Sequence, residues 1–176
     1  MNLSSGPRTA YGHGMPTDRK LGPGDDINVE YGASYKRYTT TIGRQLCLGK
    51  PTARMREIYA IQLEACDACI AAARAGVPAV VPHEATKKVI ADAGMDRYRL
   101  HTTGYGISPG FPPAWQEAVQ MFGGNPYTLE AGMVLSVEPP IFIPEEHIGA
   151  RVIDNILIKE DGAEILSTFT RDLIEL

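Results

Sequence analysis

Residues 129–139 read LEAGMVLSVEP, and this stretch decides the fold. The apolar run over 133–137 predicts a buried strand, which ends at Glu138 and the prolines that follow it. A carboxylate at the end of an apolar strand costs free energy unless it is paired, hydrogen-bonded or protonated. Glu138 is therefore a candidate catalytic residue, although an acid at the wet margin of a sheet would give the same pattern.

Further strands are predicted upstream of this stretch. Residues 26–31, DINVEY, alternate apolar and polar side chains as a half-buried strand does. Residues 35–48 are rich in β-branched and aromatic side chains, and a hairpin turn around Gly32–Ser34 would join the two strands. Glu30 lies on the polar face of the first strand, where it is either a site carboxylate or an acid in water.

Helices separate these strands from the strand that ends at Glu138. Thr52 can cap a helix that runs to about Ala75, and a second helix is predicted from about His83 to Ala93. Further strand-like segments lie near 99–107, 132–143, 151–159 and 163–169. The order of strands, helices and strands indicates an α+β domain.

Composition restricts the class of protein. The 176 residues are 44% hydrophobic and 22% charged, which suits one globular domain. The net charge of −4 comes from interspersed acids and bases, so neither a nucleic-acid nor a membrane partner is predicted. No apolar run approaches the roughly 20 residues of a membrane span, and residues 1–14 lack the apolar core of a secretory signal. We expect a cytoplasmic protein with buried, reduced cysteines.

Histidine and aromatic side chains supply the remaining candidates. His13 lies between two glycines that permit close approach of the backbone to a ligand, or else it is an exposed loop histidine. His101 and Tyr105 lie four residues apart on a predicted strand and would point the same way, or else they are polar rings at the core edge. Phe111 and Trp115 lie in a proline-stiffened loop that could wall a pocket or cap the core. The other histidines are expected to be solvated: His83 and His147.

A series of motifs extends over nearly the whole chain. These motifs are SGPRTAYGHGMPTDR at 5–19, LGPGD at 21–25, VEYG at 29–32, HTTGYGI at 101–107, LEAGMVLSVEP at 129–139 and RVIDNILIKEDGAE at 151–164. Their order and spacing resemble the C-terminal catalytic domain shared by prolidases, methionine aminopeptidases and creatinase. The resemblance implies the pita-bread fold, in which two α/β halves related by a pseudo-twofold axis hold the active site between curved sheets.

The same resemblance implies where metal ligands would lie. Metal-dependent members hold two divalent ions with two Asp, one His and two Glu. These positions fall on Glu30, Thr41, Tyr105, Glu138 and Ile153. Only two carboxylates remain, whereas a hard divalent ion takes about six oxygen or nitrogen donors, so we expect no metal and no other cofactor. Asp154 could replace Ile153 if a strand bulge turned it inward.

The segments 30–44 and 104–115 look closest to the metal-free branch of creatinase and ectoine hydrolase. The proton-transferring histidine of creatinase falls on His13. Glu138 matches a carboxylate that grips the guanidinium of creatine, and the second such carboxylate falls on Gly43, so that Glu30 would have to replace it.

We therefore expect a metal-independent hydrolase of a C–N bond in a small amidine-like compound. The catalytic residues of this hypothesis are His13 as proton shuttle, Glu30 and Glu138 as carboxylate partners of a cationic substrate, and Tyr105 to orient water. The substrate-binding residues are His101, Thr41, Phe111 and Trp115. The alternatives are a metal-dependent Xaa-Pro peptidase, or a catalytically inactive pita-bread binding module, for which a histone-chaperone subunit is the analogue.

The expected organisation is a single pita-bread catalytic-type domain over residues 1–176, truncated at its N-terminus. Family members have a helical pair before the first motif, and here that motif begins at Ser5. One sheet face would then be exposed or covered by a partner subunit. We expect a homodimer that acts on a small molecule.

Overall fold

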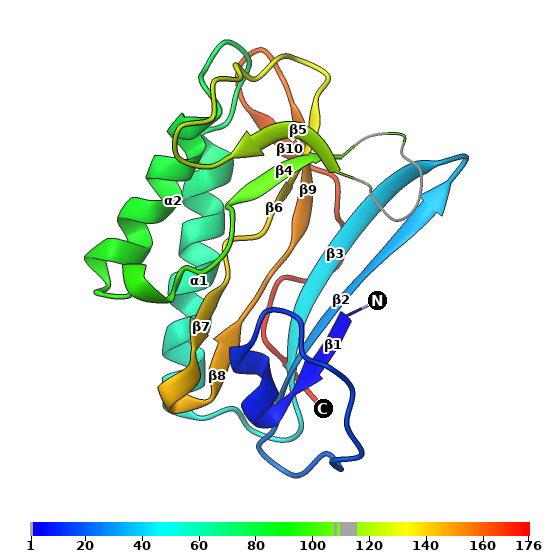
Figure 1. Cartoon of the computed structure of the whole chain (residues 1–176), viewed down its shortest axis with the longest axis vertical. Coiled ribbons are helices and arrows are strands. Elements are labelled where there is room, and N and C mark those ends of the chain that lie inside the picture. Colours follow the sequence, from blue (N-terminus) through cyan, green and yellow to red (C-terminus); the bar gives the residue numbers. More distant parts are fainter. Residues whose placement is uncertain (1, 108, 110–115) are drawn as a thin grey trace.

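Two larger β-sheets run side by side through the molecule, and the α-helices lie against one of them (Figure 1). This computed structural model describes residues 2–107, 109 and 116–176. The four-stranded sheet has the order β1-β2-β3-β11, which are Asn2–Ser5, Asp26–Tyr35, Tyr38–Cys47 and Ile174–Glu175. The five-stranded sheet has the order β10-β9-β6-β4-β5, which are Ala163–Ile165, Asp154–Ile158, Val134–Val137, Gly104–Ile107 and Gln116–Met121. A small ribbon is formed by β7, Ile141–Ile143, and β8, Ile148–Ala150.

Helix α1, Ala53–Ala72, begins where the sequence predicts, because the Thr52 side chain accepts a hydrogen bond from the Met55 amide at 3.1 Å. Helix α2, Val80–Asp92, begins at Val80 rather than at the predicted His83. Short 3-10 helices are η1 Gly6–Ala10, η2 Asp96–Tyr98 and η3 Pro144–Glu146. Within the described part of the chain, no helix is long and apolar enough to cross a membrane.

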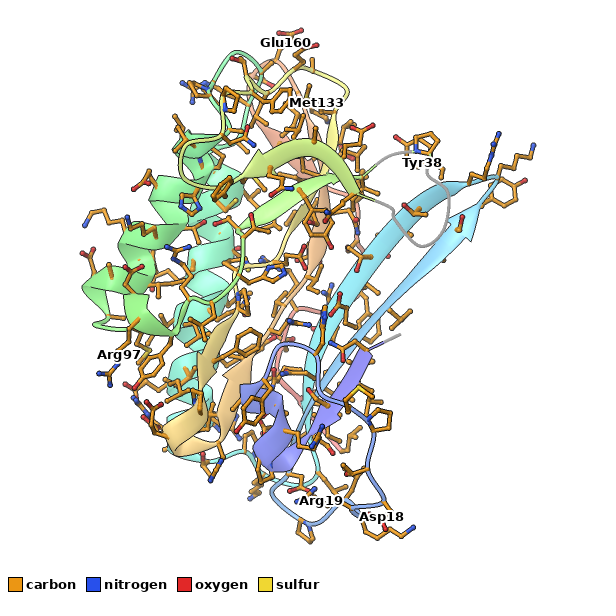
Figure 2. The ribbon with its side chains drawn as sticks, in the orientation of Figure 1. Asp18, Arg19, Tyr38, Arg97, Met133 and Glu160 are labelled. Atoms are coloured by element: carbon orange, nitrogen blue, oxygen red, sulfur yellow. The ribbon has the colours of Figure 1, made fainter. Side chains whose placement is uncertain are left out.

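The main core lies between the helices and the five-stranded sheet. Ile58 and Cys66 on α1 are buried in one apolar cluster with Leu135 on β6 and Ile156 on β9. Figure 2 shows side chains filling this space, whereas the labelled Tyr38 lies on the projecting β2–β3 hairpin, away from the helices. The cysteines are buried and free, and their burial was predicted: Cys47, Cys66 and Cys69.

The β2–β3 hairpin turns later than the sequence predicts. Tyr35 pairs with Tyr38, and the turn residues Lys36 and Arg37 have φ values of 48° and 70°. A tight two-residue turn requires positive φ at both central residues, and nothing in the side chains of Lys or Arg signals that requirement. Gly32, which suggested a turn, instead lies inside β2, where the Thr40 carbonyl of β3 leaves no room for a side chain.

The predicted strands are also shorter in the structure. The strand-like segment near 132–143 contains two strands, because β6 stops at Val137, as the prolines predict, and β7 begins at Ile141; Pro139 and Pro140 cannot donate backbone hydrogen bonds. The segments near 99–107, 151–159 and 163–169 are likewise reduced, to β4, β9 and β10. The sequence alone predicts no strand at β1, β5 or β11.

One face of the four-stranded sheet carries buried polar side chains. Asp26, Asn28 and Glu30 are all buried, whereas Tyr31 is 51% exposed on the opposite face of β2. Neither α1 nor α2 lies on that opposite face (Figure 1). This arrangement agrees with the expected pita-bread fold.

Backbone hydrogen bonds join the two sheets at Gly43 and Ile153. The Gly43 amide donates to the Ile153 carbonyl at 3.1 Å, and the Ile153 amide donates to the Gly43 carbonyl at 3.1 Å. A methyl group at position 43 would lie 2.5 Å from Cγ1 of Ile153, closer than side chains approach one another. Glycine at position 43 therefore permits the two sheets to pair around a buried isoleucine.

Asp154 is already engaged by two arginines, which opposes the possibility that it replaces Ile153 as a metal ligand. Its Oδ1 pairs with Arg44 at 2.9 Å, and its Oδ2 pairs with Arg171 at 2.8 Å. Asp154 is 1% exposed, and a buried carboxylate is stable only with such partners. The pair it makes with Arg44 strengthens the same junction between β3 and β9.

We predict that Gly43→Ala destabilises the protein by about 1–3 kcal/mol, because the new methyl group overpacks the junction against Ile153. Urea unfolding measures the effect. Gly162→Ala is the matched control, since a methyl group there meets no atom within 4 Å. Equal stability of the two variants would contradict the proposed packing, whereas partial recovery in Gly43→Ala with Ile153→Ala would support it.

Candidate active site

Glu138 follows β6 and is buried in a network of neutral donors. Its Oε1 accepts a hydrogen bond from the Ser136 hydroxyl at 2.9 Å, and the Tyr105 side chain also hydrogen-bonds to it. The Glu138 amide donates to the Thr103 carbonyl at 2.8 Å. The Ser136 hydroxyl also accepts a hydrogen bond from the Tyr105 amide at 3.1 Å. Strands β4 and β6 therefore fix this carboxyl from both its side chain and its backbone.

The environment of Glu138 favours the protonated acid. The pKa of this carboxyl is raised from 4.5 to about 7, mainly by burial and in part by the negative charge of Glu30. The hydrogen bonds from Ser136 and Tyr105 and the positive charge of Arg151 act in the opposite direction. A carboxyl with a pKa of about 7 can both donate and accept a proton near neutral pH.

Glu30 is buried on β2 and paired with a guanidinium of the protein itself. Arg151 forms an ion pair with Oε2 of Glu30, and the Asn2 side-chain amide donates to the same oxygen at 3.3 Å. The Arg151 guanidinium lies over the Phe142 ring, 5.3 Å from its centroid. The sequence predicted Glu30 as a partner for a cationic substrate, yet its carboxylate already has a cationic partner.

Arg151 is a site residue that the sequence analysis did not single out. It is 3% exposed, and its Nε has no hydrogen-bond partner among the described residues. Its place in the RVID motif, two residues before Ile153, was the available signal. An arginine inside an apolar segment needs a buried carboxylate, and Glu30 was a candidate for that partner.

His101 lies near this ion pair but not on the strand that carries Tyr105. The prediction that one strand holds both residues is wrong, because β4 begins at Gly104. Burial lowers the pKa of His101, as does the positive charge of Arg151, whereas a hydrogen bond to Thr102 and the charge of Glu30 raise it. The neutral imidazole is therefore favoured near neutral pH.

His13 lies in an exposed loop beside the Glu30–Arg151 pair. The carbonyl of the adjacent Gly12 accepts a hydrogen bond from Asn2 at 3.0 Å. A Cβ at Gly12 would lie 3.9 Å from the Arg151 guanidinium, so the loop passes close to the ion pair. In the described residues, no hydrogen bond or ion pair joins His13 to Glu30 or Glu138, and its role as proton shuttle stays a prediction.

The positions that the resemblance assigns to metal ligands do not fit a pair of divalent ions. Ile153 is an alkyl side chain packed on Gly43, and Tyr105 is a neutral phenol engaged with Glu138. Thr41 is buried, and its amide donates to Asn155 Oδ1 at 3.3 Å while its carbonyl accepts from Asn155 Nδ2. Over residues 2–107, 109 and 116–176, no cluster of three or more His, Cys, Asp or Glu side chains could hold a metal ion.

The remaining candidates divide into three outcomes. Phe111 and Trp115 lie outside the described residues. His147 is exposed, as predicted. His83 was expected to be solvated, and this prediction is wrong: it is buried on α2, with Nδ1 2.9 Å from the Thr103 hydroxyl.

A separate cavity of about 250 Å³ opens away from these residues, beside the start of α1. Asp26, Cys47, Thr52 and His147 are among the residues that line it. Asp25, also in its wall, pairs with Arg19, which Figure 2 labels at the lower end of the molecule. None of the sequence-predicted site residues lines this cavity, so it is not the candidate active site.

We predict that Glu138→Gln stabilises the folded protein above neutral pH. Since folding raises the pKa of Glu138 from 4.5 to about 7, the wild-type protein loses stability as the pH rises through this window. The loss amounts to about 3 kcal/mol, at about 1.4 kcal/mol per pH unit, and it is absent from the glutamine variant.

Urea unfolding of both proteins at pH 4 and pH 8 measures this difference. The contributions of other titrating groups are the same in both proteins and cancel in the comparison. The difference in free energy of unfolding should therefore be small at pH 4, and at pH 8 Glu138→Gln should be the more stable protein. A difference in free energy of unfolding that stays the same at both pH values would contradict a raised pKa of Glu138.

Comparisons with known proteins agree with this fold. The sequence pattern of metallopeptidase family M24 matches residues 2–160. The Xaa-Pro dipeptidase of Pyrococcus furiosus is 33% identical over 172 residues, a match that covers 98% of this chain and 48% of that protein. The structure of the Xaa-Pro dipeptidase from Bacillus anthracis superposes with a TM-score of 0.93 at 32% identity, covering 99% of this chain and 48% of that one. The X-Pro aminopeptidase from Thermotoga maritima MSB8 superposes with a TM-score of 0.92 at 30% identity, with the same coverage.

The chain thus spans about half the length of the relatives that it matches. The predicted pita-bread fold is confirmed, whereas the finer placement beside creatinase and ectoine hydrolase stays a prediction. Because the family pattern extends over most of the chain, this protein belongs to metallopeptidase family M24.

Proposed function

We propose that this chain forms a metal-independent active site that hydrolyses a C–N bond in a small molecule. The observation that carries the proposal is the buried Glu138 carboxyl, which neutral donors surround and whose pKa is raised to about 7. Such a carboxyl holds a proton at the pH at which a leaving nitrogen needs one.

The proposed reaction uses Glu138 as the proton-transfer group. A water molecule attacks the carbon of the C–N bond, the bond breaks, and the nitrogen takes the proton of Glu138. The proton lost by the water returns to the Glu138 carboxylate, which restores the acid. Tyr105, hydrogen-bonded to the same carboxyl, would orient the water or stabilise the negative charge that develops on the substrate.

The Glu30–Arg151 pair changes the expected mode of substrate binding. A guanidinium held between Glu30 and Glu138 would have to displace Arg151 from Glu30, which would leave a buried arginine without its carboxylate. We therefore propose that Glu30 does not bind the substrate, and that the substrate nitrogen approaches the Glu138 acid alone. His101, as a neutral imidazole near the pair, and Thr41 supply further polar contacts in this proposal, and His13 would exchange protons with solvent.

A second candidate is a metal-dependent Xaa-Pro dipeptidase. The names of the relatives favour it, since the Xaa-Pro dipeptidase of Pyrococcus furiosus is 33% identical to this chain. The donor set opposes it, because an alkyl side chain and a phenol stand at two of the five ligand positions that the resemblance assigns. The two candidates differ in their need for a metal, which makes them separable by experiment.

We predict that the purified protein keeps its activity after dialysis against a chelator. Creatine, ectoine and an Ala-Pro dipeptide serve as probe substrates, and release of the amine product is measured before and after addition of Mn²⁺. Turnover of an amidine or guanidine probe that Mn²⁺ does not change supports the main proposal. Turnover of Ala-Pro alone, and only with Mn²⁺, would replace it with the second candidate.

We predict that Glu138→Gln lowers kcat by about 10²- to 10⁴-fold, because the variant has no proton to donate. In the wild-type protein kcat should fall as the pH rises above about 7, where Glu138 loses its proton. Steady-state kinetics with any substrate that is turned over measures both effects. The control is Glu160→Gln, since Glu160 is exposed and far from the site (Figure 2). An unchanged kcat in Glu138→Gln would remove Glu138 from the mechanism.

A further inference from the structure

His83 lies behind the candidate active site, on the face of α2 that packs against the five-stranded sheet. It is 5% exposed, and its Nδ1 lies 2.9 Å from the Thr103 hydroxyl. The backbone of Met121 on β5 also acts on the ring, raising its pKa. A buried imidazole in contact with a buried hydroxyl is a specific arrangement, because an apolar side chain would fill the same space without a hydrogen bond.

Thr103 connects this histidine to Glu138. Its side chain is fully buried and faces His83, and its carbonyl accepts the backbone amide of Glu138 at 2.8 Å. Its amide donates to the Met121 carbonyl at 3.1 Å. The peptide that carries Glu138 is therefore held by a residue whose other contacts come from α2 and β5.

The adjacent Gly104 shows how closely this segment is packed. A Cβ at Gly104 would overlap the Ser136 carbonyl and lie 2.6 Å from Cε of Met121. Small displacements of the segment 103–105 would therefore move the Tyr105 and Ser136 groups that contact Glu138.

The charges around His83 favour its neutral form. Burial lowers its pKa, and the positive charges of Arg99 and Lys87 lower it further. Glu84, whose Oε1 lies 4.0 Å from Nε2, and the hydrogen bond to Met121 act in the opposite direction. A neutral imidazole can accept a hydrogen bond at Nδ1 from the Thr103 hydroxyl, which the protonated ring cannot.

We infer that His83 is a positioning residue, which acts through Thr103 to hold Glu138 in place for proton transfer. The inference deepens the proposed function and rests on it, because it assigns a role to a residue that touches neither substrate nor Glu138. The histidine links the helical layer to the candidate active site.

The test compares His83→Leu with His83→Asn. Leucine fills the space without a hydrogen bond, whereas the asparagine amide lies close to where Nδ1 was and can keep the contact with Thr103. Amide hydrogen exchange at Glu138 reports on its bond to the Thr103 carbonyl and needs no substrate. The Gly43 amide, bonded to Ile153 at the junction of the sheets, reports on global opening.

In His83→Leu we expect exchange at Glu138 to become at least about tenfold faster, while exchange at Gly43 stays unchanged. We expect kcat to fall about tenfold with KM within about twofold, and His83→Asn to restore both readouts. Exchange at Glu138 that stays at the wild-type rate would overturn the inference. So would equal acceleration at Gly43, which would indicate only general destabilisation.

Thr103→Val supplies a second, nearly isosteric variant if His83→Leu does not fold. It removes the hydroxyl that faces His83 and keeps the carbonyl that holds Glu138, so the same local acceleration is expected. If exchange responds as expected but no probe substrate is turned over, the proposed function fails and the positioning contact stands. If a substrate is turned over but neither variant changes exchange at Glu138, the inference alone fails.

Discussion

The paired backbone hydrogen bonds between Gly43 and Ile153 set the position of one sheet relative to the other. The geometry between the sheets depends on them, since they fix how near β2, which carries Glu30, comes to Glu138, which follows β6. The contact is possible because Gly43 has no side chain and Ile153 fills the space that a side chain would need. The Arg44–Asp154 ion pair and the Asn155 contacts to Thr41 strengthen the same junction.

The two carboxylates on either side of this junction have different partners. Glu30 is matched by the Arg151 guanidinium, whereas Glu138 is held by the hydroxyl groups of Ser136 and Tyr105. A carboxylate in an ion pair stays ionised, because its partner stabilises the negative charge. A carboxyl surrounded by neutral donors can change its protonation state. In the proposed reaction, this difference would give the two acids separate roles, one electrostatic and one in proton transfer.

The overall fold is retained more closely than the chemistry of the site. The chain superposes on the Bacillus anthracis Xaa-Pro dipeptidase with a TM-score of 0.93, yet an isoleucine and a tyrosine stand where the resemblance places metal ligands. The isoleucine serves packing, and the tyrosine hydrogen-bonds to Glu138. Membership of family M24 therefore fixes the framework, and the side chains on it decide which reaction that framework can support.

The sequence by itself determined that two helices lie between the β2–β3 strands and the later strands, that Thr52 caps the first helix, and that Glu138 follows a buried strand, because each depends on residues that are close together along the chain. Only the tertiary structure decided that Arg151 pairs with Glu30 and that His83 reaches Thr103, since these contacts join residues far apart in sequence. The turn at Lys36 was equally hidden, because the rest of the sheet imposes its backbone conformation. Local sequence patterns indicate which secondary structure a segment forms. The burial that shifts a pKa, or that makes an ion-pair partner necessary, arises only when distant segments pack together.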